Sequence, residues 1–508
     1  MTSLSDLISK GERIREHRPW PRVTVDTETW ALAATQMAEN HYTLLGLWGE
    51  PDVVHAALLD ANAGEIGAGE IGVISLGCAD GQFPSIASVH APAMRLERTI
   101  HDLFGLVPTG LPDSRPWLNH GRWGVGAPLG DRVETPLGDA APYPFLSSEG
   151  EGLHQIPVGP VHAGIIEPGH FRFTANGETI VRLEERLGYV HKGIDGLMVG
   201  TDLAHAARLA GRTSGDSTVA YAVAFSRAVE AALGVEAPPR AHYLRALMAE
   251  LERLANHFGD IGAICNDASF ALIHAHCGVL RERVLRAAYT CFGHRLMMDC
   301  VIPGGVKAEP GPDGIAALDS LLGNIRQRFP TLIKLYDNTA SLQNRMVTTG
   351  FLKPALARQY GAGGYVGRGS GRGFDARRAP GYPPYQDLDF AVPVREDGDV
   401  NARVWIRILE VEQSLSMIKQ ILTLLPDGPS CTPLPQQAGE GIALVEGFRG
   451  DILAWVRMDQ AGAVARCHLR DPSWFQWPLL EAAIEGNIVA DFPLCNKSFN
   501  CSYSGHDL

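Results

Sequence analysis

The sequence predicts an α+β fold in which a small mixed unit precedes a larger, mainly helical unit that carries a small β-sheet. Before about residue 125, short apolar runs alternate with helical spacing, whereas long helical patterns dominate after residue 158. A Gly- and Pro-rich stretch separates the two units. We therefore expect an α/β domain at residues 1–125, a linker at 126–157 and a large domain at 158–508.

The first unit shows two helical and two strand patterns. Apolar residues recur with helical spacing over Thr27–Asn40 and again over Met94–Phe104. Tyr42–Trp48 and Ile71–Leu76 are short apolar runs bounded by Gly, Asp and Pro, which is typical of strands. The stretch Gly121–Pro160 then has the composition of a linker or an extended arm.

The second unit begins with a hairpin signal and continues with amphipathic helices. Phe171–Arg182 alternates around Asn176-Gly177, a residue pair that favours a tight turn between strands. Apolar residues then fall on one face of each of four predicted helices, opposite Arg and Glu. These helices are Tyr243–Phe258, Ala271–Thr290, Gly314–Asn344 and Val404–Leu425. Two strand patterns follow, at Trp455–Met458 and Ala463–Leu469.

The composition excludes several classes of protein. The net charge of −13 and the lack of a basic run argue against nucleic-acid binding. No apolar run reaches the roughly 18 to 20 residues that a membrane-spanning helix needs, and Met1–Trp20 has no apolar segment typical of a secretory signal. The nine cysteines include no C-x-x-C pair, which argues against an iron–sulfur or zinc site built from local sequence. We therefore expect a cytoplasmic protein.

Several motifs resemble those of one redox family. Gly159–His162, Glu167–Phe173 and Leu187–Ile194 resemble the large subunit of energy-converting nickel–iron hydrogenases and the 49-kDa subunit of NADH:quinone oxidoreductase. Glu97–Leu106, followed by Leu111-Pro112-Asp113 and Trp117, resembles the 30-kDa subunit of the same oxidoreductase. The fused order of the two parts is that of the formate hydrogenlyase large subunit.

The resemblance also shows what the chain lacks. Arg212–Ser217 stands where the hydrogenases carry Arg-x-Cys-Gly-x-Cys, and Ser498–Asp507 stands where they carry the second cysteine pair. The four ligand positions fall on Ser214, Ser217, Ser502 and Gly505. A hydroxyl is a hard, poor substitute for the thiolate that nickel prefers. Cys501 lies one residue early, and a single sulfur cannot hold a two-metal centre, so we expect no metal site.

Seven residues are candidates for lining the emptied cavity. The resemblance implies that Glu167 passes protons beside Arg212, and that Arg368 and Asp375 belong to the Arg-x-Ser-Gly…Asp-x-Arg loop of both relatives. The second group comprises His162, Asp216 and Arg377. Each also has a structural interpretation, as a cap, a buried ion pair or part of a rigid loop. The Tyr that contacts quinone in the relatives aligns with Gly215, and the second His of their loop has no counterpart.

The resemblance implies a core subunit of a membrane-associated respiratory or energy-converting oxidoreductase complex. A small subunit carrying a 4Fe-4S cluster would deliver electrons, a quinone is one acceptor at the interface, and antiporter-like membrane subunits would move protons or Na⁺. No cofactor is expected within this chain itself. The chain would lie peripherally on the cytoplasmic face of the inner (plasma) membrane. Two alternatives stay open: a scaffold that couples conformational changes, and a hydrogenase with unusual ligands.

Overall fold

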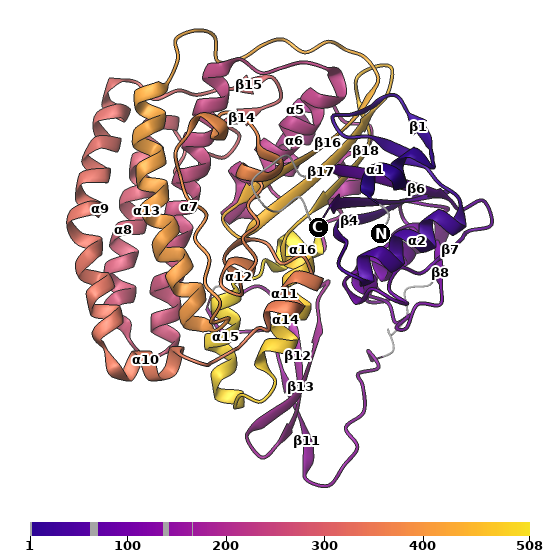
Figure 1. Cartoon of the computed structure of the whole chain (residues 1–508), viewed down its shortest axis with the longest axis horizontal. Helices are drawn as coiled ribbons and strands as arrows, with labels where there is room; N and C mark the ends of the chain where they lie inside the picture. The colour runs from indigo at the N-terminus through magenta and orange to yellow at the C-terminus, as the bar shows by residue number, and fades with distance from the viewer. Residues whose placement is uncertain (1–2, 61–69, 136–141, 165) are drawn as a thin grey trace.

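The computed structural model describes residues 3–60, 70–135, 142–164 and 166–508. The elements of its first part are α1 (Leu4–Ser9), β1 (Glu12–Ile14), β2 (His17–Arg18), β3 (Arg22–Thr24), α2 (Thr27–Ala38), β4 (Tyr42–Glu50), β5 (Val53–Asp60), β6 (Ile71–Gly77), β7 (Gln82–Pro84), α3 (Met94–Phe104), β8 (Val107–Thr109), β9 (Val125–Gly126) and β10 (Val133–Glu134). Five of these strands form a sheet in the order β1-β3-β6-β5-β4, on which α1, α2 and α3 pack (Figure 1). Only the β3–β6 pair within it is parallel.

The predicted elements of the first unit are present. Helix α2 begins after Asp26, whose carboxylate accepts a hydrogen bond from the backbone N–H of Thr29 at 2.8 Å. Helix α3 ends at Gly105, which adopts the left-handed conformation that glycine tolerates best. Strand β5 was not predicted, because it is buried along nearly its whole length and so shows no polar alternation.

The second part holds a long hairpin sheet, a helical bundle and a sheet beside it. Its elements are β11 (Leu153–Val158), β12 (His170–Asn176), β13 (Thr179–Arg186), α4 (Ile194–Met198), α5 (Leu203–Ala210), α6 (Thr218–Leu233), α7 (Pro239–Asp267), α8 (Ala271–Phe292), β14 (Val301–Ile302), β15 (Gly305–Val306), α9 (Pro312–Asn338), α10 (Ala340–Met346), α11 (Pro354–Gln359), α12 (Gly364–Arg368), α13 (Val400–Leu424), β16 (Gly439–Gly447), β17 (Gly450–Met458), β18 (Val464–Arg470), α14 (Ser473–Ile484), α15 (Phe492–Phe499) and α16 (Tyr503–Asp507). The α+β class predicted from sequence is confirmed.

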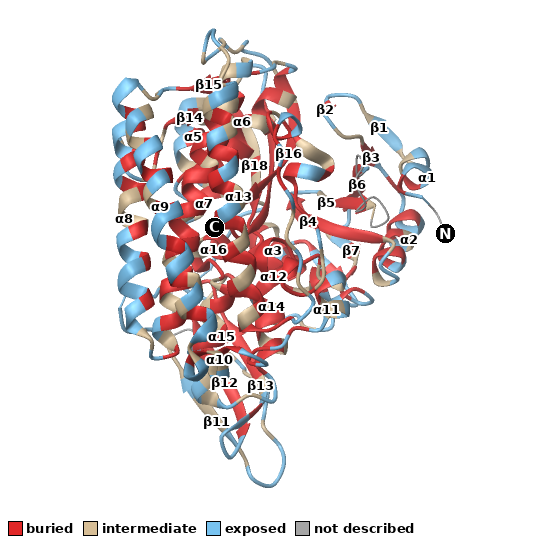
Figure 2. Ribbon diagram, turned by 60° about the vertical axis from the view of Figure 1, so that its left-hand side comes forward, coloured by how far each residue is buried: buried red, intermediate tan, exposed pale blue. Residues whose placement is uncertain are grey.

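Four long helices, α7, α8, α9 and α13, lie side by side at one end of the molecule (Figure 1). Helix α7 is buried over most of its length, whereas α8 and α9 expose their outer faces (Figure 2). Helices α7 and α9 each start with a proline in the first turn, where the missing N–H costs nothing.

No helix in the described ranges is both long and apolar enough to cross a membrane. The helix predicted over Gly314–Asn344 breaks at Thr339, which is extended.

Helix α6 was not predicted, and it occupies the centre of the second part. It packs against β16 and β17, and almost all of its residues are buried, so its sequence carries no polar face. Gly441 of β16 shows how closely the two elements approach. A Cβ atom at this position would lie 2.1 Å from the carbonyl oxygen of Ala228 on α6, so only glycine fits.

The two parts of the chain share a broad contact. Strand β2 adds in parallel to β16, so the second sheet has the order β18-β17-β16-β2. Trp48 of β4 stacks on His468 of β18 and tilts against Trp455 of β17, with ring centroids 5.4 and 5.6 Å apart. Glu50 pairs with Arg457 at 2.5 Å across the same boundary. The first sheet is therefore fixed to the second one by both polar and apolar contacts.

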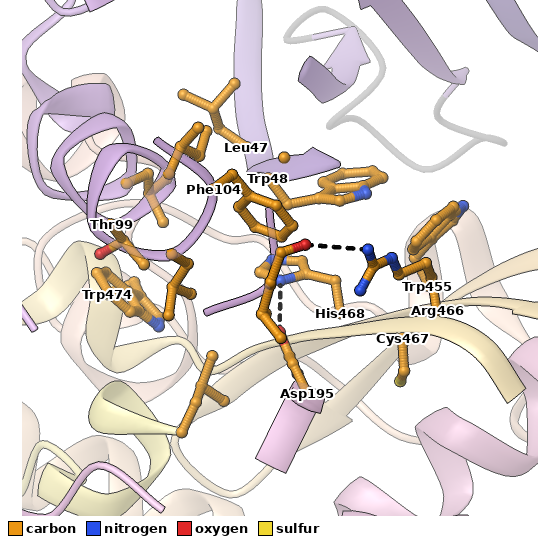
Figure 3. Close-up of a pocket in the computed structure, with 16 residues that line it drawn as sticks. Leu47, Trp48, Thr99, Phe104, Asp195, Trp455, Arg466, Cys467, His468 and Trp474 are labelled. Carbon is orange, nitrogen blue, oxygen red and sulfur yellow. Dashed lines mark hydrogen bonds and ion pairs between the residues drawn. The ribbon is translucent and has the colours of Figure 1, made fainter. Parts of the chain in front are cut away.

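A small cavity lies at this boundary, lined by Trp48, Trp455 and His468 (Figure 3). His468 contacts the Asp195 carboxylate at 3.4 Å, and Arg466 donates to the backbone carbonyl of Leu129 at 3.0 Å. The volume of the cavity is about 30 Å³, which is enough for only one or two water molecules. The cavity is therefore a packing feature and too small for an organic substrate.

The predicted linker contains more structure than its composition suggests. Residues 136–141 of it lie outside the described residues. Val125–Gly126 and Val133–Glu134 pair as β9 and β10. Residues 153–158 form β11, which pairs with β12 and completes the three-stranded sheet β11-β12-β13. The hairpin predicted around Asn176-Gly177 is present as β12 and β13.

Candidate functional site

A cleft of about 670 Å³ lies where several distant segments meet. They are the loop between β11 and β12, the turn before α6, the last turn of α7, the first turn of α8, the turn between β16 and β17 and the C-terminal segment around α15 and α16. The polar side chains that matter most for its chemistry are Glu167, Ser214, Asp216, Arg449, Lys497 and Ser502. Four of the predicted site residues, Glu167, Ser214, Asp216 and Ser502, therefore come together here.

Ser214 and Ser502 are separated by 288 positions and meet at the floor of the cleft. Their hydroxyl oxygens are 2.9 Å apart. Ser502 is also the N-cap of α16, because its hydroxyl accepts a hydrogen bond from the backbone N–H of Gly505 at 2.8 Å. Ser217 lies close by, with its hydroxyl 3.3 Å from the Arg449 guanidinium. The segments aligned with the two cysteine pairs of the hydrogenases thus converge, with hydroxyls at three of the four positions.

The fourth position, Gly505, has no room for a side chain. A Cβ atom there would lie 2.4 Å from a carboxylate oxygen of Asp471. Asp471 is itself held in place, because it accepts hydrogen bonds from the Tyr221 hydroxyl at 2.6 Å and from the backbone N–H of Ser473 at 2.9 Å. In the described part of the chain, no three His, Cys, Asp or Glu side chains are arranged so that they could hold a metal ion. The donor set at this point does not fit nickel.

An ion pair between Asp216 and Arg449 forms one wall of the cleft. The guanidinium contacts both carboxylate oxygens, at 2.8 and 2.5 Å, and donates to the backbone carbonyl of Asn500 at 2.5 Å. Although burial opposes ionisation, Arg449 and the Ser214 hydroxyl hold the pKa of Asp216 below its usual value. Asp216 remains partly exposed to the cleft while Arg449 is buried. The wall therefore presents a fixed, ionised carboxylate.

Glu167 also lines the cleft, in the loop that follows β11. Its carboxylate accepts a hydrogen bond from the backbone N–H of Ser504 at 3.2 Å, near the start of α16. Lys192 donates to the backbone carbonyl oxygens of Ser504 and Thr213, at 3.4 and 3.0 Å, and so ties these two segments together. Burial lowers the pKa of this lysine. A half-buried carboxylate at the cleft surface can take up or release a proton next to a bound molecule.

Two predicted site residues lie elsewhere. Arg212 does not lie beside Glu167 as expected; its guanidinium pairs with Asp299 at 2.5 Å and its side chain is 41% exposed. The reason is local, since Arg212 lies at the end of α5 and extends toward the loop before β14. Nε2 of His162 donates a hydrogen bond to the carbonyl oxygen of Gly169, 2.8 Å away in the same loop. Both side chains therefore have structural partners.

Arg368, Asp375 and Arg377 belong to a fully buried network, which we call the charge cluster. It consists of Glu250, Arg253, Arg368, Asp375, Arg377, Glu410 and Glu446. Arg368 contacts Glu410 at 2.7 Å and Glu446 at 2.9 Å, and Arg377 contacts Asp375 at 2.7 Å. All of these side chains are at most 2% exposed. The prediction that they line the substrate cavity is corrected, because their charges are taken up by one another.

Three residues of the cleft were not predicted from the sequence: Arg449, Lys497 and Asp267. Arg449 is in the turn between β16 and β17, and nothing in its local sequence marks it. Burial raises the pKa of Asp267, which lies near Lys497 and His274. Cys501, which the sequence marked as lying one residue before a ligand position, does line the cleft. Burial raises the pKa of its thiol.

Comparisons with known proteins show which family the chain is similar to. The family model of the respiratory-chain NADH dehydrogenase 49 kDa subunit matches residues 270–438 and 431–507, and that of the 30 kDa subunit matches residues 70–137. Formate hydrogenlyase subunit 5 of Escherichia coli is 30% identical over 84% of this chain and 77% of its own length. The carbon monoxide-induced hydrogenase of Rhodospirillum rubrum is 31% identical over 68% of this chain and 97% of its own length.

Two further similarities widen this set. One subunit of the NADH-quinone oxidoreductase of Desulfotalea psychrophila is 30% identical over 66% of this chain and 92% of its own length. A solved chain of a membrane-bound sulfane sulfur reductase, an archaeal respiratory membrane complex, superposes with a TM-score of 0.67 and 25% identity, over 70% of this chain and 99% of that chain. The chain therefore belongs to the family that unites the 49 kDa subunit of respiratory-chain NADH dehydrogenase with these hydrogenase subunits.

Proposed function

We propose that this chain is the core subunit of a membrane-associated oxidoreductase complex and reduces or oxidises an organic substrate, such as a quinone, in the cleft beside Glu167. The observation that carries the proposal is the meeting of Ser214 and Ser502 at 2.9 Å. It supports the alignment of these positions with the metal ligands of hydrogenases, and it puts hydroxyls where nickel needs thiolates. The cleft has thus kept its place in the fold with a different set of donors.

The volume and the polar groups of the cleft favour an organic substrate. About 670 Å³ lies within the usual range for small-molecule sites. The reduction of a quinone requires protons as well as electrons, and the electrons would come from the iron–sulfur cluster of a partner subunit. Glu167 is placed to pass a proton to the bound molecule. Arg449 and Asp216 hold each other in a fixed geometry in the same cleft and present an oriented charge.

The surface around the cleft supports the presence of partners. Val161 is 84% exposed and Ile166 is 42% exposed in the loop that carries Glu167. Exposed apolar side chains around a site are typical of a surface that another protein covers. We propose an iron–sulfur small subunit as this partner, and integral antiporter-like subunits that use the reaction to move protons or Na⁺. The chain would then lie peripherally on the cytoplasmic face of the membrane.

Elemental analysis and one substitution test the proposal in the purified complex. We expect far less than one nickel atom per chain, and we expect Glu167→Gln to lower quinone-dependent turnover by about 100-fold while the complex stays assembled. Glu178→Gln, in the exposed turn between β12 and β13, is the control and should leave turnover unchanged. Nickel at one atom per chain would support a hydrogenase with unusual ligands. Unchanged turnover in Glu167→Gln would support the scaffold alternative.

A further inference from the structure

The hydroxyls on the floor of the cleft belong to one short chain of hydrogen bonds. The Ser214 hydroxyl oxygen lies 2.8 Å from the Asp216 carboxylate and 2.9 Å from the Ser502 hydroxyl oxygen. The Ser502 oxygen also accepts the backbone N–H of Gly505 at 2.8 Å, and the backbone N–H of Ser502 donates to the Ser473 hydroxyl at 2.8 Å. Direct contacts therefore join the three side chains of this chain and hold them in place.

Arg449 fixes the protonation state at one end of the chain. Its guanidinium donates to both carboxylate oxygens of Asp216, at 2.8 and 2.5 Å. A proton on either oxygen would face an N–H donor, so this bidentate geometry requires the ionised carboxylate. An ionised carboxylate accepts hydrogen bonds and donates none. The proton in the 2.8 Å contact between Ser214 and Asp216 therefore comes from the Ser214 hydroxyl.

The direction of the remaining hydrogen bonds follows from counting protons. A serine hydroxyl has one proton to donate and two lone pairs that accept. Because Ser214 gives its proton to Asp216, the proton in its 2.9 Å contact with Ser502 must come from Ser502. Ser502 uses one lone pair for the N–H of Gly505, and Ser214 uses one for Ser502. Each oxygen thus keeps one lone pair, and neither has a proton left to give.

A molecule bound on this floor consequently meets hydrogen-bond acceptors. Ser214 and Ser502 both line the cleft, and so does Glu167, whose carboxylate accepts the backbone N–H of Ser504. A carbonyl oxygen placed against the two serines would face lone pairs and would lose the hydrogen bonds that it makes with water. A hydroxyl group of the bound molecule would instead supply the donor that the floor lacks.

We propose that the cleft prefers the reduced, hydroxyl-bearing form of its substrate, such as a hydroquinone, whose O–H donates to Ser214 or Ser502. This inference rests on the proposed function, because it concerns the substrate of the same cleft. A quinone takes up two electrons and two protons to become a hydroquinone, so its oxygens only accept before reduction and can donate after it. Tighter binding of the reduced form raises the midpoint potential of the bound couple, by about 30 mV for each factor of ten between the dissociation constants. The floor thus favours electron flow from the complex to the substrate.

Calorimetry with a matched pair of probes tests the preference in the purified complex. Duroquinone and its hydroquinone share one ring, whose methyl groups block the addition of thiols, and anaerobic conditions keep the hydroquinone reduced. We expect the hydroquinone to bind about tenfold more tightly, or better. Ser214→Ala removes the acceptor of the Ser502 proton, which becomes free to donate to a ligand, so the ratio of affinities should fall to about one or below. Ser9→Ala, at the exposed end of α1, is the matched control and should keep the wild-type ratio.

Asp216→Asn provides a second route to the same result. The amide can donate to the Ser214 oxygen, so a hydroxyl proton is again free on the floor and the preference should fall. Equal affinity for both probes in wild type, no saturable binding of either probe, or a wild-type ratio in both variants would overturn the inference.

The proposed function is tested separately, by turnover of Glu167→Gln. Slow turnover of that variant together with equal affinity for the two probes in wild type would overturn the preference alone. Normal turnover of Glu167→Gln, with the preference for the hydroquinone intact, would instead count against the proposed function.

Discussion

The cleft and the charge cluster both contain paired Arg and Asp side chains, but the pair in the cleft is partly exposed and the pairs in the cluster are buried. In the cleft, Asp216 pairs with Arg449 and keeps 35% of its side chain exposed. In the charge cluster, Arg368 is fully buried and contacts three carboxylates. The sequence pattern predicted both regions as linings of one cavity. The comparison shows that an Arg and Asp motif indicates a site only where some of its hydrogen-bonding capacity faces open space.

The charge balance of the cluster makes the same point. Four acids face three arginines, and the adjacent His257 stays neutral, because burial lowers its pKa. One acid should therefore hold a proton, and we expect it to be Glu446, because burial and the charge of Asp375 raise its pKa to about 7. Burial works against ionisation in both regions, but Arg449 outweighs it for Asp216 in the cleft.

The largest expected effect comes from Arg368→Ala in the charge cluster. The change leaves Glu410, Glu446 and Asp375 buried without their shared cation. Breaking a buried ion pair from one side costs about 3 to 5 kcal/mol, which is a large part of the stability of most domains. We expect most of the variant to be insoluble and the denaturant midpoint of the remainder to fall sharply. A midpoint within error of wild type would show that the cluster does not support the fold.

The second effect tests the floor of the cleft. Ser214→Cys, Ser217→Cys and Ser502→Cys together should fold, because a thiol is only slightly larger than a hydroxyl. Adding Gly505→Cys should cost a further amount of about 1 to 3 kcal/mol, since the new Cβ overlaps the Asp471 carboxylate. Thermal unfolding of the triple and quadruple variants measures the difference. Equal stability of the two variants would contradict the predicted overlap at Gly505. Nickel bound at one atom per chain in the quadruple variant would show that the fourth side chain does fit.

Asp216→Asn separates function from stability within the cleft. Arg449 is buried and Asp216 is 35% exposed, so the loss of the pair should cost about 1 to 3 kcal/mol of folding free energy, which is less than the loss of Arg368. Turnover should fall by about tenfold, because Arg449 loses the carboxylate that orients it. The measurement is kcat of the complex together with the denaturant midpoint of the same preparation. A large stability loss with normal kcat would show that Asp216 supports the fold, as the charge cluster does, and has no part in turnover.

Much of the helical fold could be predicted from sequence, and burial explains several of the exceptions. Helices α8 and α13 begin and end within about four residues of the prediction, because one side of each is polar and exposed. Helix α6 and strands β5 and β16 were missed, because they are buried on nearly all sides and show no periodic pattern. A periodic pattern of apolar and polar residues arises when one face of an element is exposed to water, and these three elements have no such face.

The candidate site divides in the same way. Glu167, Ser214 and Ser502 could be placed by motif, because their neighbours along the chain carry the resemblance. Arg449 could not, since it reaches Asp216 from a turn 233 positions away and its sequence context is ordinary. The burial of Arg368 was equally hidden, because a glycine-rich loop looks the same whether it faces a ligand or the side chains of Glu410 and Glu446.

A pH series sharpens the comparison through Glu446. Its folded pKa of about 7 lies above the ordinary value of 4.5, so the folded state favours the neutral acid. The stability that this group contributes is therefore complete below about pH 4.5 and is lost as the pH rises through about 7. The denaturant midpoint of wild type should decline over that window more steeply than that of Glu446→Gln. Parallel pH profiles for the two proteins would mean that the cluster holds its proton elsewhere.

The smallest effect is expected for Arg212→Ala. Arg212 was predicted to line the cavity, but its pair with Asp299 has side chains that are 41% and 32% exposed. Water screens such a pair, so its removal should change stability by about 0.5 kcal/mol or less and should leave turnover unchanged. Asp299→Asn is the matched change on the other side of the pair and should behave alike. A tenfold loss of kcat in Arg212→Ala, absent from Asp299→Asn, would contradict this prediction. It would mean that Arg212 acts in the cleft and changes partner when the complex assembles.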